Sequence, residues 1–173
     1  MEIVTIFAES LYAVEHEGEA ENEYDRLMNL WTDVFYLRQF AKESDIKNIK
    51  SFIEEISEDA EDIQDFMDDV DDGETGIGAF FKTLYNNESG FRVLSLQKGR
   101  PHRKSYLRLY AIRIDAGTYL ITGGAIKLVA TMQENEELMK ELRVLNKVKA
   151  YLQDNDVFDS DSFQEFKTEL DES

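Results

Sequence analysis

An apolar stripe between residues 46 and 70 limits what this chain can fold into more than any other feature. Its members recur at alternating steps of three and four residues: Ile46, Ile49, Ile53, Ile56, Ala60, Ile63, Met67 and Val70. A repeat of about 3.5 residues is typical of a long helix whose apolar face winds around a second helix. The stripe therefore predicts a long helix with one face buried along its whole length.

The partner of this long helix is expected directly before it. Residues 23–42 carry a second apolar stripe at helical spacing, formed by Leu27, Trp31, Val34 and Ala41. Only a short polar segment separates the two stretches, so an antiparallel helical hairpin over about residues 23–72 is the economical arrangement. A homodimeric coiled coil is the alternative use of the same stripe.

Strands are predicted on both sides of the hairpin. Residues 3–14 are rich in β-forming side chains and are broken near Glu9, which predicts a strand or a short β-hairpin. An antiparallel sheet is predicted over about residues 91–130, with a three-residue turn at residues 115–117 between two of its strands. Gly123 and Gly124 follow in the second of these strands, where they indicate a bulge or the close approach of another backbone.

The fold class that follows is α+β, with N-terminal strands, the antiparallel helical hairpin, and an antiparallel β-sheet with C-terminal helices. A capping sequence at residues 131–134 opens a helix that runs to about residue 153, and another at residues 162–165 opens a last short helix. A length of 173 residues suits one domain. We expect that domain to cover residues 1–153, and residues 154–173 to form a short helical tail.

Charge is distributed unevenly along the chain. The net charge is −18, yet residues 89–114 contain seven Lys and Arg residues and no acid. The overall charge argues against indiscriminate binding to nucleic acid or to an anionic membrane, because like charges repel. The long helix carries eleven acids between residues 54 and 72, which predicts a solvated outer face. The basic segment either binds an anion or pairs with the surrounding carboxylates.

Several kinds of site are excluded or not expected. The chain has no cysteine, which excludes disulfides and thiol catalysis. Its two histidines lie far apart and the acidic run at residues 68–75 lacks the ligand pattern of a calcium loop, so no metal site is expected. No cofactor-binding motif is found, so no cofactor is expected. Neither signal-peptide features nor an apolar run of ~20 residues is seen, so we expect a cytoplasmic protein that does not contact a membrane.

The strand predicted over residues 105–114 presents two different faces. Tyr106, Arg108 and Tyr110 are expected on one face, and the residues between them on the other. Arginine grips phosphate through two hydrogen bonds, while tyrosine rings stack on the bases of single-stranded nucleic acid. Such a face also suits RNA cleavage without a metal, which requires a base, an acid and cations near the phosphate. The alternative is that both tyrosines pack beneath a helix while Arg108 pairs with an acid.

The stretch SYLRLYAIRIDAGTYLITGGAIKLVATMQENEEL, at residues 105–138, resembles the C-terminal half of the RelE/HigB-like toxin superfamily, in particular its phage-derived branch. In that family an arginine-bearing strand, a tight turn and a second strand lead into a loop with lysines and then a helix. The order of elements over residues 1–150 is also similar. The resemblance implies a RelE-like α+β domain with a toxin-type activity on RNA. The sequence departs from the family at Gly124, Ala125 and Leu128, which replace a large apolar residue and a second lysine.

The resemblance implies that Arg108 contacts phosphate and that Lys127 belongs to the loop after the strands. Together with Tyr110 they are the predicted catalytic residues of a metal-independent endoribonuclease that acts on RNA or ribosome-associated mRNA. The residues predicted to bind the RNA are Lys98, Arg100, Arg103, Lys104 and Tyr106. The alternative is a non-catalytic protein-interaction module that docks an antitoxin, another protein or a second copy of the chain.

Overall fold

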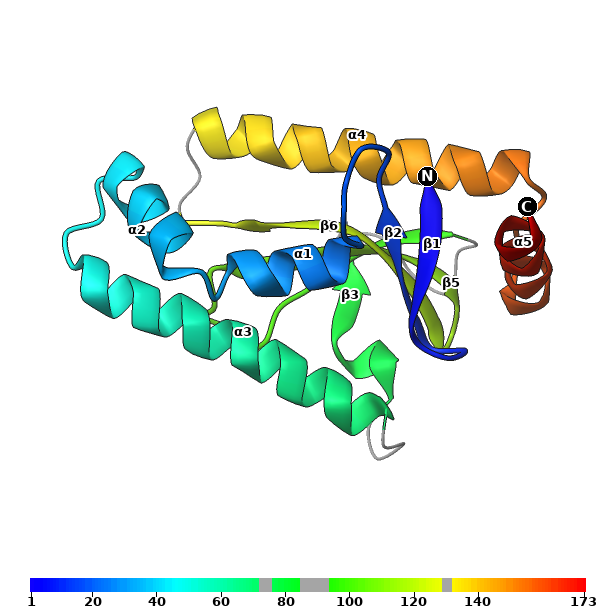
Figure 1. Cartoon of the computed structure of the whole chain (residues 1–173), viewed down its shortest axis with the longest axis horizontal. Coiled ribbons are helices and arrows are strands. Elements are labelled where there is room, and N and C mark those ends of the chain that lie inside the picture. The colour runs from blue at the N-terminus through cyan, green and yellow to red at the C-terminus, as the bar shows by residue number, and fades with distance from the viewer. Residues whose placement is uncertain (72–75, 85–93, 129–131) are drawn as a thin grey trace.

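A six-stranded sheet with helices on both faces forms the centre of the protein (Figure 1). The computed structural model describes residues 1–71, 76–84, 94–128 and 132–173. The helices are α1 (Glu23–Leu30), α2 (Val34–Glu43), α3 (Ile49–Asp71), the short 3₁₀ helix η1 (Ile77–Ala79), α4 (Met132–Asp154) and α5 (Ser160–Glu172). The strands are β1 (Glu2–Phe7), β2 (Leu11–Glu15), β3 (Phe81–Thr83), β4 (Ser95–Gly99), β5 (Leu107–Asp115) and β6 (Thr118–Ile126). The predicted α+β class is confirmed.

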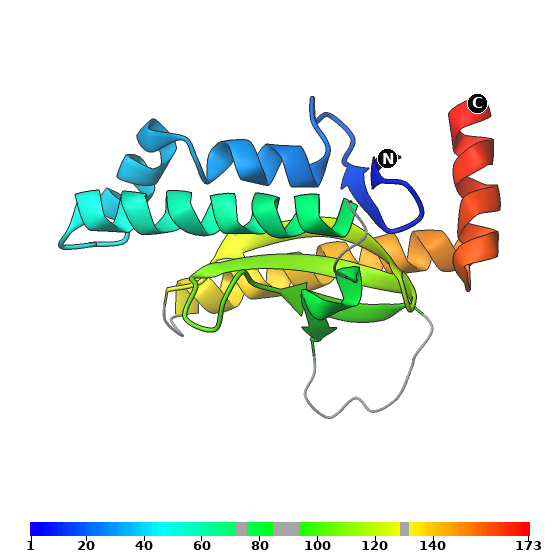
Figure 2. The ribbon, with the colours of Figure 1, turned by 90° about the horizontal axis from the view of Figure 1, so that it is seen from below.

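Two apolar cores lie on the two faces of the sheet. Helices α1, α2 and α3 cover one face, where Leu107 and Leu109 of β5 are buried (Figure 2). Helices α4 and α5 cover the other face, where Ile112 and Ile114 of the same strand are buried. Successive side chains of a strand point to opposite faces, so β5 supplies both cores at once. It does so because six of its nine residues are apolar and they are divided between the two faces.

The N-terminal residues form the predicted hairpin, in which β1 and β2 pair antiparallel across a turn where Glu9 has a φ of 69°. Strand β2 then pairs with β6 in parallel, from Leu11 opposite Tyr119 to Ala13 opposite Ile121. The sheet has the order β1-β2-β6-β5-β4-β3 and is therefore mixed, because the N-terminal hairpin joins the antiparallel strands by a parallel pairing that the sequence did not predict. The reason is that β2 is buried on both faces, which suits an inner strand and not a separate ribbon.

The remaining strands pair antiparallel, as predicted, but their limits differ. The β5–β6 hairpin is confirmed, although its turn contains only Ala116 and Gly117. Strand β4 continues to Gly99, so Lys98 of the basic segment lies within the sheet. Strand β3 was not predicted. The first and last parts of the predicted sheet, residues 91–93 and 129–130, lie outside the described residues.

The predicted helical hairpin is confirmed, with α3 running antiparallel to α1 and α2 (Figure 2). Its first arm is broken in two, because the Asp33 carboxylate caps α2 by accepting hydrogen bonds from the backbone N–H groups of Phe35 and Tyr36 at 2.9 and 3.3 Å. Because the helix is interrupted here, the apolar residues directly after the break no longer continue the buried face of α1. Val34 is 46% exposed and Phe35 is 81% exposed. The prediction that Val34 belongs to the buried stripe is wrong.

The stripe of α3 packs within the chain. Ile56, Ala60, Ile63 and Met67 are fully buried in the core between α3 and the sheet. The acids of this helix were all expected on its outer face, but Asp59 is only 4% exposed. It lies one residue before Ala60 and therefore on the flank of the buried stripe, where its carboxylate contacts the segment between β4 and β5.

The C-terminal helices complete the second core. Leu145 and Leu152 of α4 are fully buried there, and Phe163 and Phe166 of α5 join them, so the predicted tail packs on the domain. Helix α5 begins earlier than predicted, because Asp159 and Ser162 form its capping box. The capping sequence predicted at residues 131–134 is not fully within the described residues. No helix in the described ranges is long and apolar enough to cross a membrane.

Gly123 and Gly124 fulfil both roles that the sequence indicated. The pairing of β5 with β6 shifts by one residue beside them, which is a β-bulge. A Cβ atom on Gly124 would lie 2.7 Å from the Arg108 carbonyl oxygen, 2.8 Å from Leu27 Cδ1 and 3.0 Å from Trp31 Cη2. Helix α1 therefore approaches β6 at a point where only glycine fits.

Replacing Gly124 by alanine should destabilise the fold. We expect Gly124→Ala to lower the free energy of unfolding by about 1–3 kcal/mol, because backbone and core side chains must move to admit the methyl group. Urea denaturation measures the change. Gly117→Ala is the matched control, since a Cβ there meets nothing within 4 Å. Equal stability of the two variants would contradict the close packing of α1 on β6.

Candidate functional site

A pocket of about 640 Å³ opens on the face of the sheet that α4 covers. Leu138 and Leu142 of α4 form part of its wall, and Phe80 and Leu84 beside β3 form another. Its cationic residues are Lys82, Lys98, Arg100, Arg103, Arg108 and Lys127, and we call them the cationic pocket. The structure thus brings together Arg108, Lys127 and Tyr110, the three residues predicted to be catalytic.

The strand register explains how these cations meet. Lys82 of β3 pairs with Lys98 of β4, which pairs with Tyr110 of β5, which in turn lies opposite Gly123 of β6. Arg108 lies two residues before Tyr110 and therefore on the same face. Lys127 follows the end of β6. Residues from four adjacent strands thus contribute, which spreads the positive charge over about 14 Å at the usual spacing between strands.

The cations of the pocket have no carboxylate partners among the described residues. The described residues form ion pairs between His16 and Glu23, Arg26 and Glu23, His102 and Asp59, and Lys167 and Asp171. The Arg108 guanidinium instead donates to two backbone carbonyl oxygens, those of Ser105 at 2.6 Å and Leu107 at 2.9 Å. Within the described residues Arg108 therefore does not pair with an acid, which was the alternative role considered for it.

The pocket cations repel one another. Burial lowers the pKa of Lys98, and the positive charges of Lys127, Arg108 and Arg100 lower it further. Burial also lowers the pKa of Arg108, again with a contribution from Arg100. An anion bound here would relieve this repulsion, so the site favours a negatively charged ligand.

The tyrosines do not form the predicted stacking face. Tyr106 precedes β5 and packs on the opposite side of the sheet, with its ring 6.4 Å from that of Phe52 in α3. The prediction that it shares a face with Arg108 is wrong, because the alternation of β5 begins only at Leu107. Tyr110 lines the pocket but is 4% exposed, and burial together with the charge of Glu141 raises the pKa of its phenol. It therefore presents a neutral hydroxyl to the pocket.

Lys104 does not line the pocket, although it was predicted to bind RNA, whereas Lys82 and His102 line it and were not predicted. Lys82 was missed because β3 was not recognised as a strand. His102 had one sequence signal, its place within the basic segment. A carboxylate near Tyr110, that of Glu141, was also missed, and its position between Leu138 and Leu142 on the apolar side of α4 was the signal.

Glu141 lies over β6 next to Tyr110. Its carboxylate stands where a side chain at position 123 would be, and Gly123 pairs directly with Tyr110. Burial raises the pKa of Glu141 to about 7, and the negative charge of Glu23 contributes in the same direction. The positive charges of Lys140 and Arg26 oppose the shift, and Glu137 adds to it.

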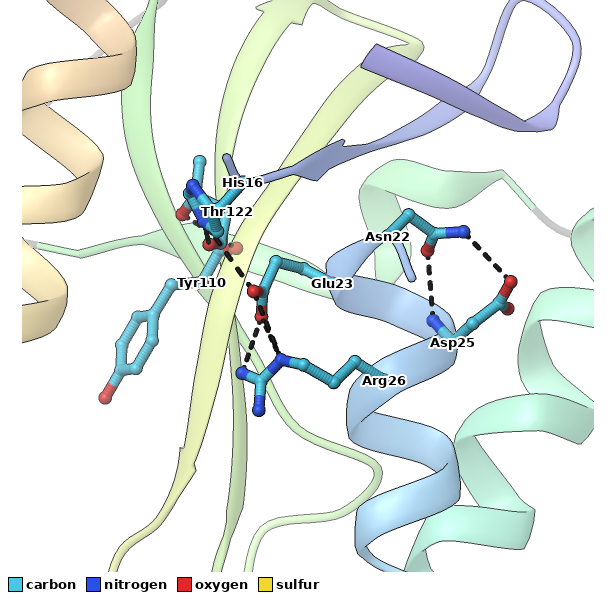
Figure 3. A network of polar contacts seen from close by, with 7 residues as sticks. All are labelled: His16, Asn22, Glu23, Asp25, Arg26, Tyr110 and Thr122. Carbon is cyan, nitrogen blue, oxygen red and sulfur yellow. Dashed lines mark hydrogen bonds and ion pairs between the residues drawn. The ribbon is translucent and has the colours of Figure 1, made fainter. Parts of the chain in front are cut away.

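A polar network that contains Glu23 lies beside β6 (Figure 3). His16 Nε2 donates to the Thr122 carbonyl oxygen at 3.0 Å and lies 3.7 Å from Glu23 Oε1. The buried Glu23 carboxylate also accepts a hydrogen bond from Arg26 Nη2 at 2.7 Å. Glu23 thus has the Arg26 guanidinium as a direct partner, whereas Glu141 forms no hydrogen bond with the described residues and burial raises its pKa.

The described residues include no group of three or more His, Cys, Asp or Glu side chains that could hold a metal ion. Comparison with protein-family models, curated proteins and solved structures gave no match to this chain. The resemblance to the RelE/HigB-like toxins stays a prediction.

The raised pKa of Glu141 predicts a pH-dependent effect on stability. The folded-state pKa of about 7 lies above the usual 4.5, so the stabilising proton is held at low pH and is lost as the pH rises through about 7. Glu141→Gln keeps the shape and cannot ionise. We expect it to be roughly 1–3 kcal/mol more stable than the wild type at about pH 8 and nearly equal at about pH 5.

Denaturation curves at the two pH values measure this difference. Glu136→Gln, an exposed acid of the same helix, is the control and should show no such dependence. A Glu141→Gln protein that gains no stability at the higher pH would show that the carboxylate is well solvated.

Proposed function

We propose that this protein binds RNA, holding the phosphates of a single strand in the cationic pocket. The main support is that the six lysine and arginine side chains of the cationic pocket pair with no carboxylate of the described residues. They do so in a chain whose net charge is −18. Because acids are so abundant in this chain, lysines and arginines that have no carboxylate partner in the described part of the structure are unexpected. Guanidinium and ammonium groups are the side chains that bind phosphate most strongly.

The distribution of the cations favours a ligand with several phosphates. Lys98 and Arg108 line the pocket and are half-buried, whereas Arg100 and Arg103 are exposed. A single phosphate is too small to contact charges spread over about 14 Å. A polynucleotide strand presents one negative charge per nucleotide and suits such a row.

The acidic remainder of the protein favours a single strand over a duplex. Helix α3, which carries many of the acids, lies on the opposite face of the sheet from α4 (Figure 2), and Asp59 is the acid of α3 that contacts the pocket residue His102 within the described residues. A strand that enters the pocket meets positive charge locally, while a wide duplex brings more phosphates toward the acidic surface. On this proposal the protein is a RelE/HigB-like, toxin-type protein of the cytoplasm, its ligand is RNA or ribosome-associated mRNA, and an antitoxin is its protein partner.

Removing a pocket cation should weaken RNA binding. We expect Arg108→Ala and Lys127→Ala each to reduce the affinity for a short single-stranded RNA about 10- to 100-fold, because each loses a charge-assisted contact to phosphate. The slope of log affinity against log salt should fall by about 0.7 per lost contact. Fluorescence anisotropy at several salt concentrations measures both quantities.

Lys147→Ala is the matched control, because Lys147 is an exposed lysine of α4 away from the pocket and its removal changes the net charge equally. Equal weakening by all three variants would show that binding reflects overall charge alone. If the wild type binds no RNA but binds an acidic protein through these residues, the protein is an interaction module and the proposal is wrong.

A further inference from the structure

His102 lines the cationic pocket and is held there by a buried acid from α3. Its Nε2 atom lies 2.8 Å from Asp59 Oδ1. The other carboxylate oxygen accepts a hydrogen bond from Ser105 Oγ at 2.7 Å, and Ser105 Oγ accepts one from the Leu107 backbone at 3.1 Å. The histidine side chain is 45% exposed and the aspartate side chain 6%. Each carboxylate oxygen of Asp59 thus has a hydrogen-bond partner, which is Ser105 for one oxygen and the His102 imidazole for the other.

This contact fixes which nitrogen of His102 is basic. A carboxylate only accepts hydrogen bonds, so Nε2 carries the proton and Nδ1 keeps its lone pair in the neutral ring. Among the described residues no hydrogen bond engages Nδ1. A carboxylate that orients an imidazole in this way is the arrangement by which enzymes position a general base.

A purely structural role explains the contact of Asp59 with Ser105 but not its contact with His102. The bond between Ser105 and Asp59 already fastens the segment before β5 to α3. The histidine ring adds little buried surface, since almost half of its side chain is exposed in a pocket that also contains Arg100 and Arg103. A base beside bound phosphates needs these two properties, a fixed orientation and an open ring nitrogen.

We infer that His102 is an acid–base catalytic residue and that the protein cleaves the RNA held in the cationic pocket, with Asp59 as its positioning residue. This inference rests on the proposed function. His102 Nδ1 accepts the proton of a ribose 2′-hydroxyl, and the 2′-oxygen forms a bond to the adjacent phosphorus. The bond from phosphorus to the 5′-oxygen breaks, and that oxygen takes a proton from the Lys98 ammonium. The products are a 2′,3′-cyclic phosphate and a 5′-hydroxyl.

The neighbouring cations suit this reaction. Arg108 and Lys127 line the same pocket and can stabilise the negative charge that develops on the phosphate oxygens. Burial and three neighbouring positive charges lower the pKa of Lys98, which makes its ammonium a better proton donor. No metal ion takes part in these steps.

His102→Gln separates catalysis from structure. The glutamine amide nitrogen can donate to Asp59 as Nε2 does, but the side chain has no basic nitrogen. We expect unchanged thermal stability, RNA affinity within about twofold of the wild type, and a cleavage rate lower by at least about 100-fold. The probe is a labelled single-stranded RNA, and its all-2′-deoxy counterpart should bind and remain intact.

Asp59→Asn tests the positioning residue. It should lower kcat and displace the pH profile of cleavage with little change in KM, because the amide can favour the wrong tautomer of His102. A change in stability with unaltered kcat would show that Asp59 serves the fold alone.

The outcomes distinguish this inference from the proposed function. If the wild type binds RNA without cutting it, or if His102→Gln cuts at the wild-type rate, the inference is wrong and RNA binding stands. If His102→Gln loses binding and stability together with cleavage, His102 is a structural residue. If the wild type binds no RNA, the proposed function itself fails.

Discussion

The contact of both helix layers with β6 depends on two adjacent glycines. Gly124 leaves space for Leu27 of α1 and for Trp31, which follows that helix, and Gly123 leaves space for the Glu141 carboxylate of α4. Since β6 lies between β2 and β5, these contacts join the helical hairpin, the sheet and the C-terminal helix at one place. The register across β6 then sets the pocket, because Tyr110 lies opposite Gly123 and Arg108 lies opposite Ala125. Because Gly123 has no side chain and Ala125 has only a methyl group, β6 leaves room beside Tyr110 and Arg108.

The sheet also separates the two charges of the molecule. Its α3 face carries the acidic helix, and its α4 face carries the cationic pocket. The long helix therefore does not neutralise the pocket. Asp59 is the acid of α3 that contacts this region within the described residues, and its partners are His102 and Ser105 and not a lysine or arginine. One carboxylate thus orients a base while the surrounding positive charge is preserved for a ligand.

The sequence predicted those features that depend on local periodicity. The long stripe identified α3 and its partner, and alternation placed Arg108 and Tyr110 on one face of β5. Features that depend on contacts between distant segments were not predictable in this way. The parallel pairing of β2 with β6 follows from burial on both faces, and the displacement of Tyr106 follows from the residue at which β5 begins. The roles of Lys82, His102 and Asp59 depend likewise on segments that meet only in the folded chain.

Nuclear magnetic resonance of the folded protein during titration with a single-stranded RNA tests the central claim most directly. The side-chain signals of Arg108 and of the lysines at positions 98 and 127 should shift together and saturate at one affinity, while that of Lys147 stays unchanged. Shifts that spread over exposed lysines without saturation, or their absence at Arg108, would contradict a phosphate-binding role for the cationic pocket.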